Sequence, residues 1–319
     1  MSDRGARVVA GSANRALARS VAAVLAVAPV AVDMERFPDG ELRPAVAEVR
    51  GEDVYVLQPT GPPVNEHLVE LLLLLDACRR AGAARLTAVV PYFGYARQDR
   101  RGKAGEAVGV RVVADALAAA GADRLVVIDP HTVALEAVCP VPVEMLTAVP
   151  ALAAALRPLI ADAAVLVAPD LGAVKLAERY ASILRRQVIV IRKTRVSGEV
   201  VRAHELVGEV RERPAVIVDD MISTGSTVEA ATAVLDAYGA APGPTVAATH
   251  GPLVSGALER MEAAGVARAV VTDTVARREL PLDDVELGSL RVCSVAGLLA
   301  DAIDRLHRDR PLDDLLIHA

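Results

Sequence analysis

The chain reads VIVDDMISTGST over residues 216–227. The apolar, β-branched run at the start of this stretch predicts a buried strand. Two acids, Asp219 and Asp220, stand at the end of that strand, and a loop of Ser, Thr and Gly follows. Residues 228–238 predict a helix. A strand, a loop and a helix in this order are typical of a parallel α/β sheet.

The loop between this strand and this helix is suited to binding a phosphate group. Backbone N–H groups and hydroxyls at the start of a helix can hold a phosphate monoester. The two acids before the loop suit the hydroxyls of a sugar or a hydrated Mg²⁺ ion. An ordinary turn with capping Ser and Thr side chains is the simpler alternative. Such a turn does not need two acids directly before it, so we favour the phosphate site.

The composition predicts two domains in a reducing compartment. At 319 residues the chain is long enough for two ordinary cores, and 53% of its residues are apolar. A net charge of −6 argues against a broad basic face for nucleic acid. Cys78, Cys139 and Cys293 follow no metal-binding spacing and suggest no disulfide framework. The N-terminus lacks an apolar signal core and residues 71–75 are too short to cross a bilayer, so we expect a cytoplasmic protein without membrane contact.

Short apolar runs alternate with Ala- and Leu-rich helical stretches along the chain. This alternation predicts an α/β fold in which helices cover both faces of parallel sheets. Prolines punctuate the middle of the chain, and we place a domain boundary near Pro150. The expected strands are residues 8–10, 53–57, 86–90, 125–128, 165–168, 188–191, 215–218, 246–249, 269–272 and 291–294. The expected helices are residues 15–27, 65–81, 108–120, 149–160, 174–184, 228–238, 253–264 and 295–306.

The loop at residues 223–227 resembles the phosphoribosyl-pyrophosphate (PRPP) motif of phosphoribosyltransferases and PRPP synthetases. Other stretches resemble only the second family, ribose-phosphate pyrophosphokinase. They are FPDGE (37–41), PVNEHL (63–68), VPYFGYARQDR (90–100), APD (168–170) and Thr249-His250. The resemblance runs in order over residues 7–307. It implies two tandem phosphoribosyltransferase-like domains, 1–150 and 151–307, followed by a C-terminal tail, 308–319.

The resemblance implies that the PRPP-motif loop binds the 5-phosphate of ribose 5-phosphate and that the preceding acids face the ribose hydroxyls. The family usually has Asp where Ser223 stands and Gly where Ser226 stands. The added Cβ of Ser226 could crowd a phosphate, or its hydroxyl could add a donor. The implied ribose 5-phosphate residues are Arg195, Asp219, Asp220, Ser223, Thr224, Gly225, Ser226 and Thr227.

A basic segment, Arg192-Lys193-Thr194-Arg195, follows a predicted strand and precedes a Ser-Gly pair. It is similar to the mobile catalytic loop of the family, and Lys193 and Arg195 match its catalytic cations. Cations brought to a transferring phosphoryl group stabilise its dispersed negative charge. A solvated basic turn is the alternative for such a run taken alone.

His131 and Asp170 each follow a predicted strand. The resemblance assigns both to a Mg²⁺ site, partly through water. Mg²⁺ prefers oxygen ligands, so a histidine is unusual there, and a packed or capping role is the alternative. Asp129 lies two residues before His131 and is a weaker candidate.

The ATP site is implied by two of the matching motifs. An adenine needs an apolar or aromatic face and a few hydrogen bonds at its edge, and Phe37 is one of two Phe residues in the chain. In the family the segment around Phe37 reaches a neighbouring subunit, which implies a homo-oligomer built from dimers, with a hexamer as one option. The implied ATP-binding residues are Phe37, Asp39, Gly40, Glu41, Arg97, Gln98 and Asp99.

The function implied is transfer of the β,γ-diphosphoryl group of Mg-ATP to the 1-hydroxyl of ribose 5-phosphate, giving PRPP and AMP for nucleotide biosynthesis. One alternative is a non-catalytic paralogue that regulates catalytic subunits. Loss of the loop cations or metal ligands would indicate it, but Lys193, Arg195, His131 and Asp170 are present. A phosphoribosyltransferase is the second alternative.

Overall fold

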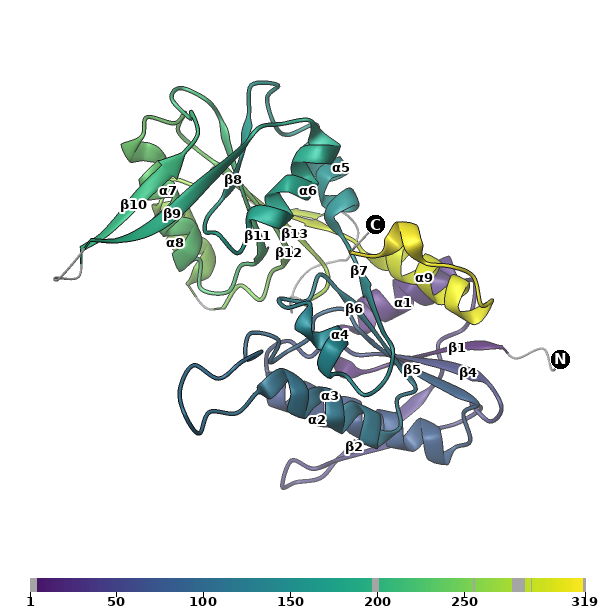
Figure 1. The fold of residues 1–319 in the computed structure, drawn as a ribbon. Helices are drawn as coiled ribbons and strands as arrows, with labels where there is room; N and C mark the ends of the chain where they lie inside the picture. The colour runs from purple at the N-terminus through teal and green to yellow at the C-terminus, as the bar shows by residue number, and fades with distance from the viewer. Residues whose placement is uncertain (1–4, 197–200, 255, 277–284, 288, 318–319) are drawn as a thin grey trace. The chain divides into compact units, whose positions relative to one another are not determined.

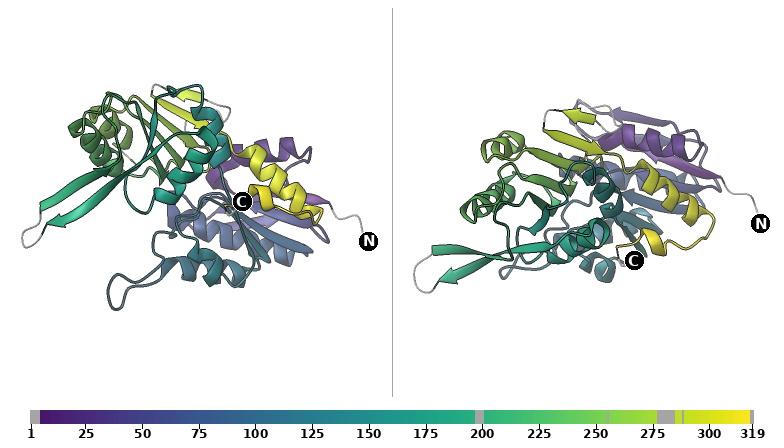
Figure 2. Two further views of the ribbon diagram at one scale, coloured as in Figure 1. Left: turned by 45° about the horizontal axis from the view of Figure 1, so that its top comes forward. Right: turned by 90° about the horizontal axis from the view of Figure 1, so that it is seen from above.

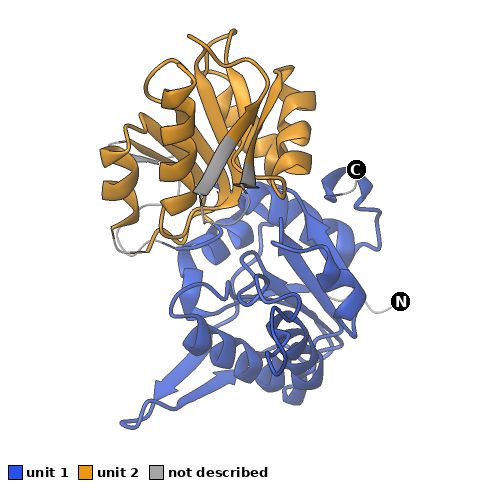
Figure 3. Cartoon of the chain, turned by 60° about the vertical axis from the view of Figure 1, so that its left-hand side comes forward, with its two compact units in different colours: residues 1–147, 274–281, 294–319 blue, residues 148–273, 282–293 orange. Residues whose placement is uncertain are grey.

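The structure is a computed structural model that describes residues 5–196, 201–254, 256–276, 285–287 and 289–317. It contains two compact units (Figure 3). Unit 1 comprises Met1–Thr147, Thr274–Pro281 and Ser294–Ala319, and unit 2 comprises Ala148–Asp273 and Leu282–Cys293. Each unit holds a mostly parallel sheet with helices packed on it, which confirms the predicted α/β fold class.

Unit 1 is built on a five-stranded sheet in the order β1-β4-β5-β6-β7, with all neighbours parallel (Figure 1). Helices α2 and α3 pack against each other, and α1 packs against α9. The strands are β1 (Ala6–Ala10), β4 (Asp53–Leu57), β5 (Arg85–Val90), β6 (Arg124–Ile128) and β7 (Val143–Leu146). The helices are α1 (Arg15–Val24), α2 (Val64–Arg80), α3 (Gly109–Ala120), α4 (Ala134–Val138) and α9 (Ala296–His307), with short 3-10 turns η1 (Ser12–Asn14) and η2 (Asp313–Leu315).

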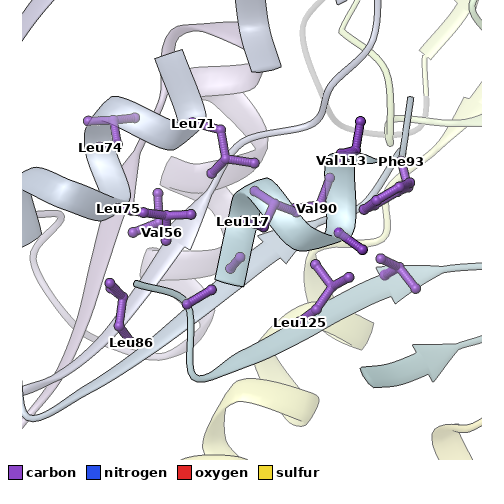
Figure 4. Packing of buried hydrophobic residues seen from close by; sticks show 14 of the residues in the cluster. Val56, Leu71, Leu74, Leu75, Leu86, Val90, Phe93, Val113, Leu117 and Leu125 are labelled. Atoms are coloured by element: carbon purple, nitrogen blue, oxygen red, sulfur yellow. The ribbon is translucent and has the colours of Figure 1, made fainter. Parts of the chain in front are cut away.

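The core of unit 1 follows the two-residue period of its strands. Val54 and Val56 of β4 belong to the apolar cluster that contains Leu71 and Leu75 of α2 (Figure 4). The intervening residue Tyr55 points to the opposite face and is only 1% exposed. Both faces of this sheet are therefore covered, as expected for a parallel sheet.

Unit 2 is built on an eight-stranded sheet in the order β10-β9-β8-β11-β12-β13-β15-β14. The strands from β9 to β15 are parallel, and β10 and β14 add antiparallel edges. The strands are β8 (Val165–Ala168), β9 (Val188–Val196), β10 (Val201–Val207), β11 (Ala215–Met221), β12 (Thr245–His250), β13 (Arg268–Thr272), β14 (Val285–Leu287) and β15 (Leu290–Cys293). The helices are α5 (Val149–Leu156), α6 (Val174–Leu184), α7 (Ser226–Ala237) and α8 (Ala257–Ala263).

Two antiparallel strands of unit 1, β2 (Val32–Arg36) and β3 (Leu42–Val46), form a hairpin separate from the main sheet. The hairpin packs on α2 through β3. Residues 37–41 form the turn at its tip, and the N–H of Phe37 donates to the carbonyl of Glu41 at 2.9 Å. The motif matched to the ATP site therefore stands at the end of a β-ribbon.

The C-terminal part of the chain packs differently from the predicted domain division. The prediction assigned residues 151–307 to the second domain and 308–319 to a separate tail, whereas the structure packs residues from Ser294 onward with unit 1. The N–H of Ile317 donates to the carbonyl of Met145 at 2.8 Å, and the Ile317 side chain joins the apolar cluster. The packing of α9 on α1 and of Ile317 beside β7 thus attaches the last described residues to unit 1.

Among the described residues, no helix has the length and apolar composition needed to cross a bilayer.

Candidate active site

The acids predicted to bind ribose and metal gather at one edge of the unit 2 sheet. Strands β8 and β11 are parallel neighbours, with Leu166 level with Val216. Asp170 follows β8, while Asp219 and Asp220 lie near the end of β11. The carboxyl ends of parallel strands share one edge, where α/β proteins bind their ligands.

Asp219 is strongly influenced by this crowding. Burial is the main cause that raises the pKa of Asp219 to about 8, and the negative charges of Asp220 and Asp170 raise it further. The N–H of Asp220 opposes them by donating to Oδ1 of Asp219 at 2.9 Å. The ionised form of Asp219 would be favoured by a nearby cation.

The donor set at this edge consists of carboxylate oxygens, which fits the preference of Mg²⁺ for oxygen ligands. Oδ1 of Asp170 also accepts hydrogen bonds from the N–H groups of Gly172 (2.8 Å) and Ala173 (3.2 Å), at the start of α6. Among the described residues, no three His, Cys, Asp or Glu side chains are arranged as a ready-made metal cage.

The predicted phosphate loop, residues 223–227, leads directly into α7, which begins at Ser226 rather than at the predicted Val228. Gly225 precedes the helix with φ 77°, and a Cβ there would meet the carbonyl oxygen of Ala257 at 3.0 Å. The hydroxyls of Thr224 and Ser226 lie 3.0 Å apart, and the N–H of Ser226 donates to Oγ1 of Thr224 at 3.4 Å. Ser226 and Thr227 are exposed, so their hydroxyls stand at the surface of the loop.

A segment following β12 supports this loop through the backbone. The N–H of Ile222 donates to the carbonyl of His250 at 2.9 Å, and the carbonyl of Ile222 accepts from the N–H of Leu253 at 3.0 Å. The carbonyl of Ser223 accepts from Val254 at 3.0 Å. The Thr249-His250 motif had no assigned role from sequence; in the structure the backbone carbonyl of His250, at the end of β12, helps to hold the loop.

The segment interpreted as a catalytic loop is a strand in the structure, so the expected end of the strand at residue 191 is wrong. Strand β9 continues to Val196, and Lys193 pairs with His204 of β10. Val190 is level with Ala168, the last residue of β8, so β9 runs on past the end of β8 with only β10 beside it (Figures 1 and 2). This places the backbone of Lys193 and Arg195 beyond the same edge as Asp170; their side chains lie outside the described part.

His131 and Asp129 follow β6 in unit 1. Asp129 is 4% exposed and has φ 35°, a left-handed conformation that Asp tolerates better than most residues. His131 is exposed two residues later. Asp170 belongs to unit 2, so a shared metal site for His131 and Asp170 stays a prediction.

The motif at residues 90–100 divides into an anchored part and an exposed part. Phe93 is 4% exposed within the apolar cluster of unit 1. The N–H of Gly94 donates to Oγ1 of Thr60 at 2.7 Å, and a Cβ on Gly94 would meet the Thr60 carbonyl oxygen at 2.6 Å. Arg97 and Gln98 are exposed and Asp99 is half-buried, so the predicted ATP residues of this motif lie at the surface.

The chain was compared with known proteins. Residues 6–121 match the N-terminal domain of ribose phosphate pyrophosphokinase, residues 144–250 a phosphoribosyl transferase domain, and residues 199–316 a phosphoribosyl synthetase-associated domain. A ribose-phosphate pyrophosphokinase from Gloeobacter violaceus is 37% identical, covering 99% of this chain and 94% of its own. The chain belongs to the ribose-phosphate pyrophosphokinase family. A second family member, from Burkholderia pseudomallei, is 38% identical over 95% of both chains.

The fold of the family is confirmed by a solved structure. Phosphoribosylpyrophosphate synthetase from Mycobacterium smegmatis is 36% identical, with a TM-score of 0.88 over 96% of this chain and 100% of that one. Family membership, which the sequence motifs had predicted, is therefore established over nearly the whole chain. The family's reaction is the frame in which the site can be interpreted.

Proposed function

We propose that this protein transfers the β,γ-diphosphoryl group of Mg-ATP to the 1-hydroxyl of ribose 5-phosphate, producing PRPP and AMP. The observation that carries the proposal is the sheet edge of unit 2. There, a loop of Ser, Thr and Gly that opens a helix follows paired acids, in a chain that matches a family member over 99% of its length. PRPP supplies activated ribose for nucleotide biosynthesis.

The loop of residues 223–227 binds the 5-phosphate. Its support is the helix start at Ser226, where backbone N–H groups and the positive end of the helix dipole favour an anion. The exposed hydroxyls of Ser226 and Thr227 add donors, so Ser226 contributes a ligand that Gly at this position would not. Asp219 and Asp220 bind the ribose hydroxyls at the end of β11.

Asp170 would hold Mg²⁺, partly through water, and His131 is the second residue assigned to the ion. Bound Mg²⁺ offsets the negative charge of the triphosphate and of the diphosphoryl group as it moves. The carboxylate-rich edge around Asp170 and Asp219 supports this assignment. Ionised Asp219 is then stabilised by an opposite charge, and the repulsion within the acid cluster is relieved.

The 1-hydroxyl of ribose attacks the β-phosphorus of ATP in line, and AMP leaves. No covalent enzyme intermediate is required, so positioning and charge stabilisation account for the rate. Lys193 and Arg195 stabilise the charge that develops between nucleophile and leaving group. Their place on a ribbon beyond the end of β8 supports this role.

ATP binds through the two exposed motifs of unit 1, and the β2–β3 hairpin serves a neighbouring subunit of a homo-oligomer. The support is the projection of its tip, where Asp39, Gly40 and Glu41 are all exposed. The residues assigned to ATP are Phe37, Asp39, Gly40, Glu41, Arg97, Gln98 and Asp99.

The test is a reaction of the purified protein with ribose 5-phosphate, ATP and MgCl₂, with AMP and PRPP measured together. Equal amounts of both products are expected. No turnover with tight binding to an active family member would favour the regulatory paralogue instead. Consumption of added PRPP only in the presence of a nucleobase would favour a phosphoribosyltransferase.

A further inference from the structure

The aromatic ring at the tip of the β2–β3 hairpin is covered by a cation. The Cζ atom of Arg43 lies 5.2 Å from the ring centroid of Phe37. A guanidinium within about 6 Å of a ring centroid is attracted by the ring's negative face. Phe37 is half-buried although it stands in an exposed turn, and Arg43 lies beside it.

Arg43 is held over the ring by a second contact. Glu35 is its register partner across the hairpin, and the two side chains form an ion pair. Both side chains are well exposed, at 67% for Arg43 and 46% for Glu35, so the pair by itself adds little stability. Its consequence is geometric, because it favours the conformation in which the planar guanidinium lies between the Glu35 carboxylate and the Phe37 ring.

The backbone beneath the ring is also fixed. The N–H of Phe37 donates to the carbonyl of Glu41, and the N–H of Gly40 donates to the carbonyl of Phe37, both at 2.9 Å. Arg36 ties the hairpin to α2 through Glu66, with 3.6 Å between Nη2 and Oε2. With the backbone closed in a turn, the remaining freedom of Phe37 lies in its side-chain torsions, and Arg43 restricts them. A planar ligand that stacks on Phe37 must use the face opposite Arg43.

We infer that Arg43 is a positioning residue for nucleotide binding, which holds the Phe37 ring so that its opposite face stacks on the adenine of ATP. Glu35 is the anchor of Arg43. The inference rests on the proposed function, which assigns Phe37 to the ATP site. It adds the cross-strand pair of Glu35 and Arg43, residues outside the FPDGE motif, to the machinery that selects the nucleotide.

The first measurement uses steady-state kinetics. An exposed cation–π contact that preorganises the ring can change the affinity for ATP by at most about two- to five-fold when it is lost. Arg43→Gln should therefore raise the KM for ATP by that factor, while kcat and the KM for ribose 5-phosphate stay the same. Arg43→Lys keeps the charge but lacks the planar fork, and it should fall between the parent and Arg43→Gln.

The second measurement follows binding directly. The chain contains no Trp, so Phe37→Trp creates a single Trp at the tip, whose emission can be excited selectively over that of the Tyr residues, while keeping an aromatic partner for Arg43. ATP should change its emission, and adding Arg43→Gln should weaken the ATP Kd by the same two- to five-fold. Glu35→Gln should act in the same direction. Asp33→Asn is the matched control, because Asp33 is an exposed acid on the same face of β2, two residues away, and its register partner is Ala45.

The outcomes separate the inference from the proposed function. An ATP Kd that is equal with and without Arg43→Gln, in a Phe37→Trp protein that responds to ATP, overturns the role of Arg43 alone. If the Phe37→Trp protein is active but its Trp emission does not change at saturating ATP, Phe37 does not belong to the ATP site. The inference is then overturned as well. If Asp33→Asn weakened the ATP Kd as much as Glu35→Gln does, the effect would come from the overall charge of the hairpin, and the role of Arg43 would also be overturned.

Discussion

At the scale of single residues, Asp219 is the group that responds most to its surroundings. Its pKa is raised from 3.8 to about 8, first by burial and then by Asp220 and Asp170. A carboxyl group with a higher pKa in the folded chain binds its proton more tightly there. Protonated Asp219 contributes fully to stability below the pKa that the group has in the unfolded chain. This contribution is lost as the pH rises towards the pKa that it has in the folded chain.

We therefore expect Asp219→Asn to change the pH dependence of unfolding. Without divalent cations, the variant should melt above the parent near pH ~9, and the difference should shrink near pH ~5, where the parent carboxyl is protonated. Thermal melts in EDTA across this range measure it. Added MgCl₂ should lower the pKa of Asp219 and narrow the gap at high pH. If the difference in melting temperature between the parent and the variant were the same at every pH, the raised pKa of Asp219 in the buried acid cluster would be contradicted.

Gly225 tests the geometry of the phosphate loop. Its φ of 77° and the 3.0 Å approach of the Ala257 carbonyl oxygen both oppose a side chain. A left-handed Ala costs about 1–2 kcal/mol, so Gly225→Ala should raise the KM for ribose 5-phosphate about 5- to 30-fold as the loop shifts. The KM for ATP should change less. Gly265→Ala is the control, since Gly265 has φ 84° and a Cβ added there would meet no atom within 4 Å.

At the scale of elements, a buried acid fastens α9 to the first sheet. Asp53 of β4 is 1% exposed. Its Oδ2 accepts hydrogen bonds from Arg85 (2.5 Å) and Tyr55 (3.0 Å) and lies 2.9 Å from Nδ1 of His307 at the end of α9. Arg85 also donates to the His307 carbonyl at 3.1 Å. One carboxylate thus joins residues 254 positions apart in sequence.

Asp53→Ala should lower the free energy of unfolding by about 1–3 kcal/mol, because it leaves the hydroxyl of the buried Tyr55 without its acceptor and removes the partner of Arg85 and His307. Urea unfolding followed by circular dichroism measures the change. Asp76→Ala is the control: Asp76 pairs with Arg80 on the exposed side of α2, and such a pair contributes about 0.5 kcal/mol or less. Similar losses in both variants would contradict the role given to the Asp53 cluster.

The elements also show where sequence reasoning succeeds. The helix predicted over residues 174–184 matches α6, and each expected parallel strand has an observed counterpart, because buried apolar runs mark them clearly. The hairpin strands β2 and β3 were not predicted, since they alternate polar residues and carry Pro44. The end of β9 was placed too early for a related reason. Its basic residues resemble a loop, and only pairing with β10 makes them a strand.

The candidate site was predictable to the extent that it is local. The acids and the phosphate loop are contiguous in sequence, and the structure brings Asp170 to them through the β8–β11 pairing. The support from His250 and Leu253 was not predictable, because it consists of backbone hydrogen bonds between segments some 30 residues apart. The cover of Arg43 on Phe37 depends on the register of an unpredicted hairpin.

At the scale of the whole molecule, the proposed function assigns the β2–β3 hairpin of one subunit to the active site of another. We expect that an inactive Asp39→Ala, Glu41→Ala double variant and an inactive Lys193→Ala variant regain activity when mixed and allowed to exchange subunits. Some mixed sites would then combine an intact hairpin with an intact Lys193. The product assay after co-refolding measures this, with each variant refolded alone as the control. Verified mixed oligomers without activity would show that each chain completes its own site.

The packing of α9 on α1 has a consequence for how the protein is made. The first sheet is translated early, yet the helix that packs against α1 ends at His307, which is 254 positions after its partner Asp53. The strands of unit 2 precede α9 in the chain and are therefore translated before it. The first sheet therefore has one face incompletely covered until α9 has also been translated. The sheet that is translated first thus completes its packing only after the strands of unit 2 have been translated.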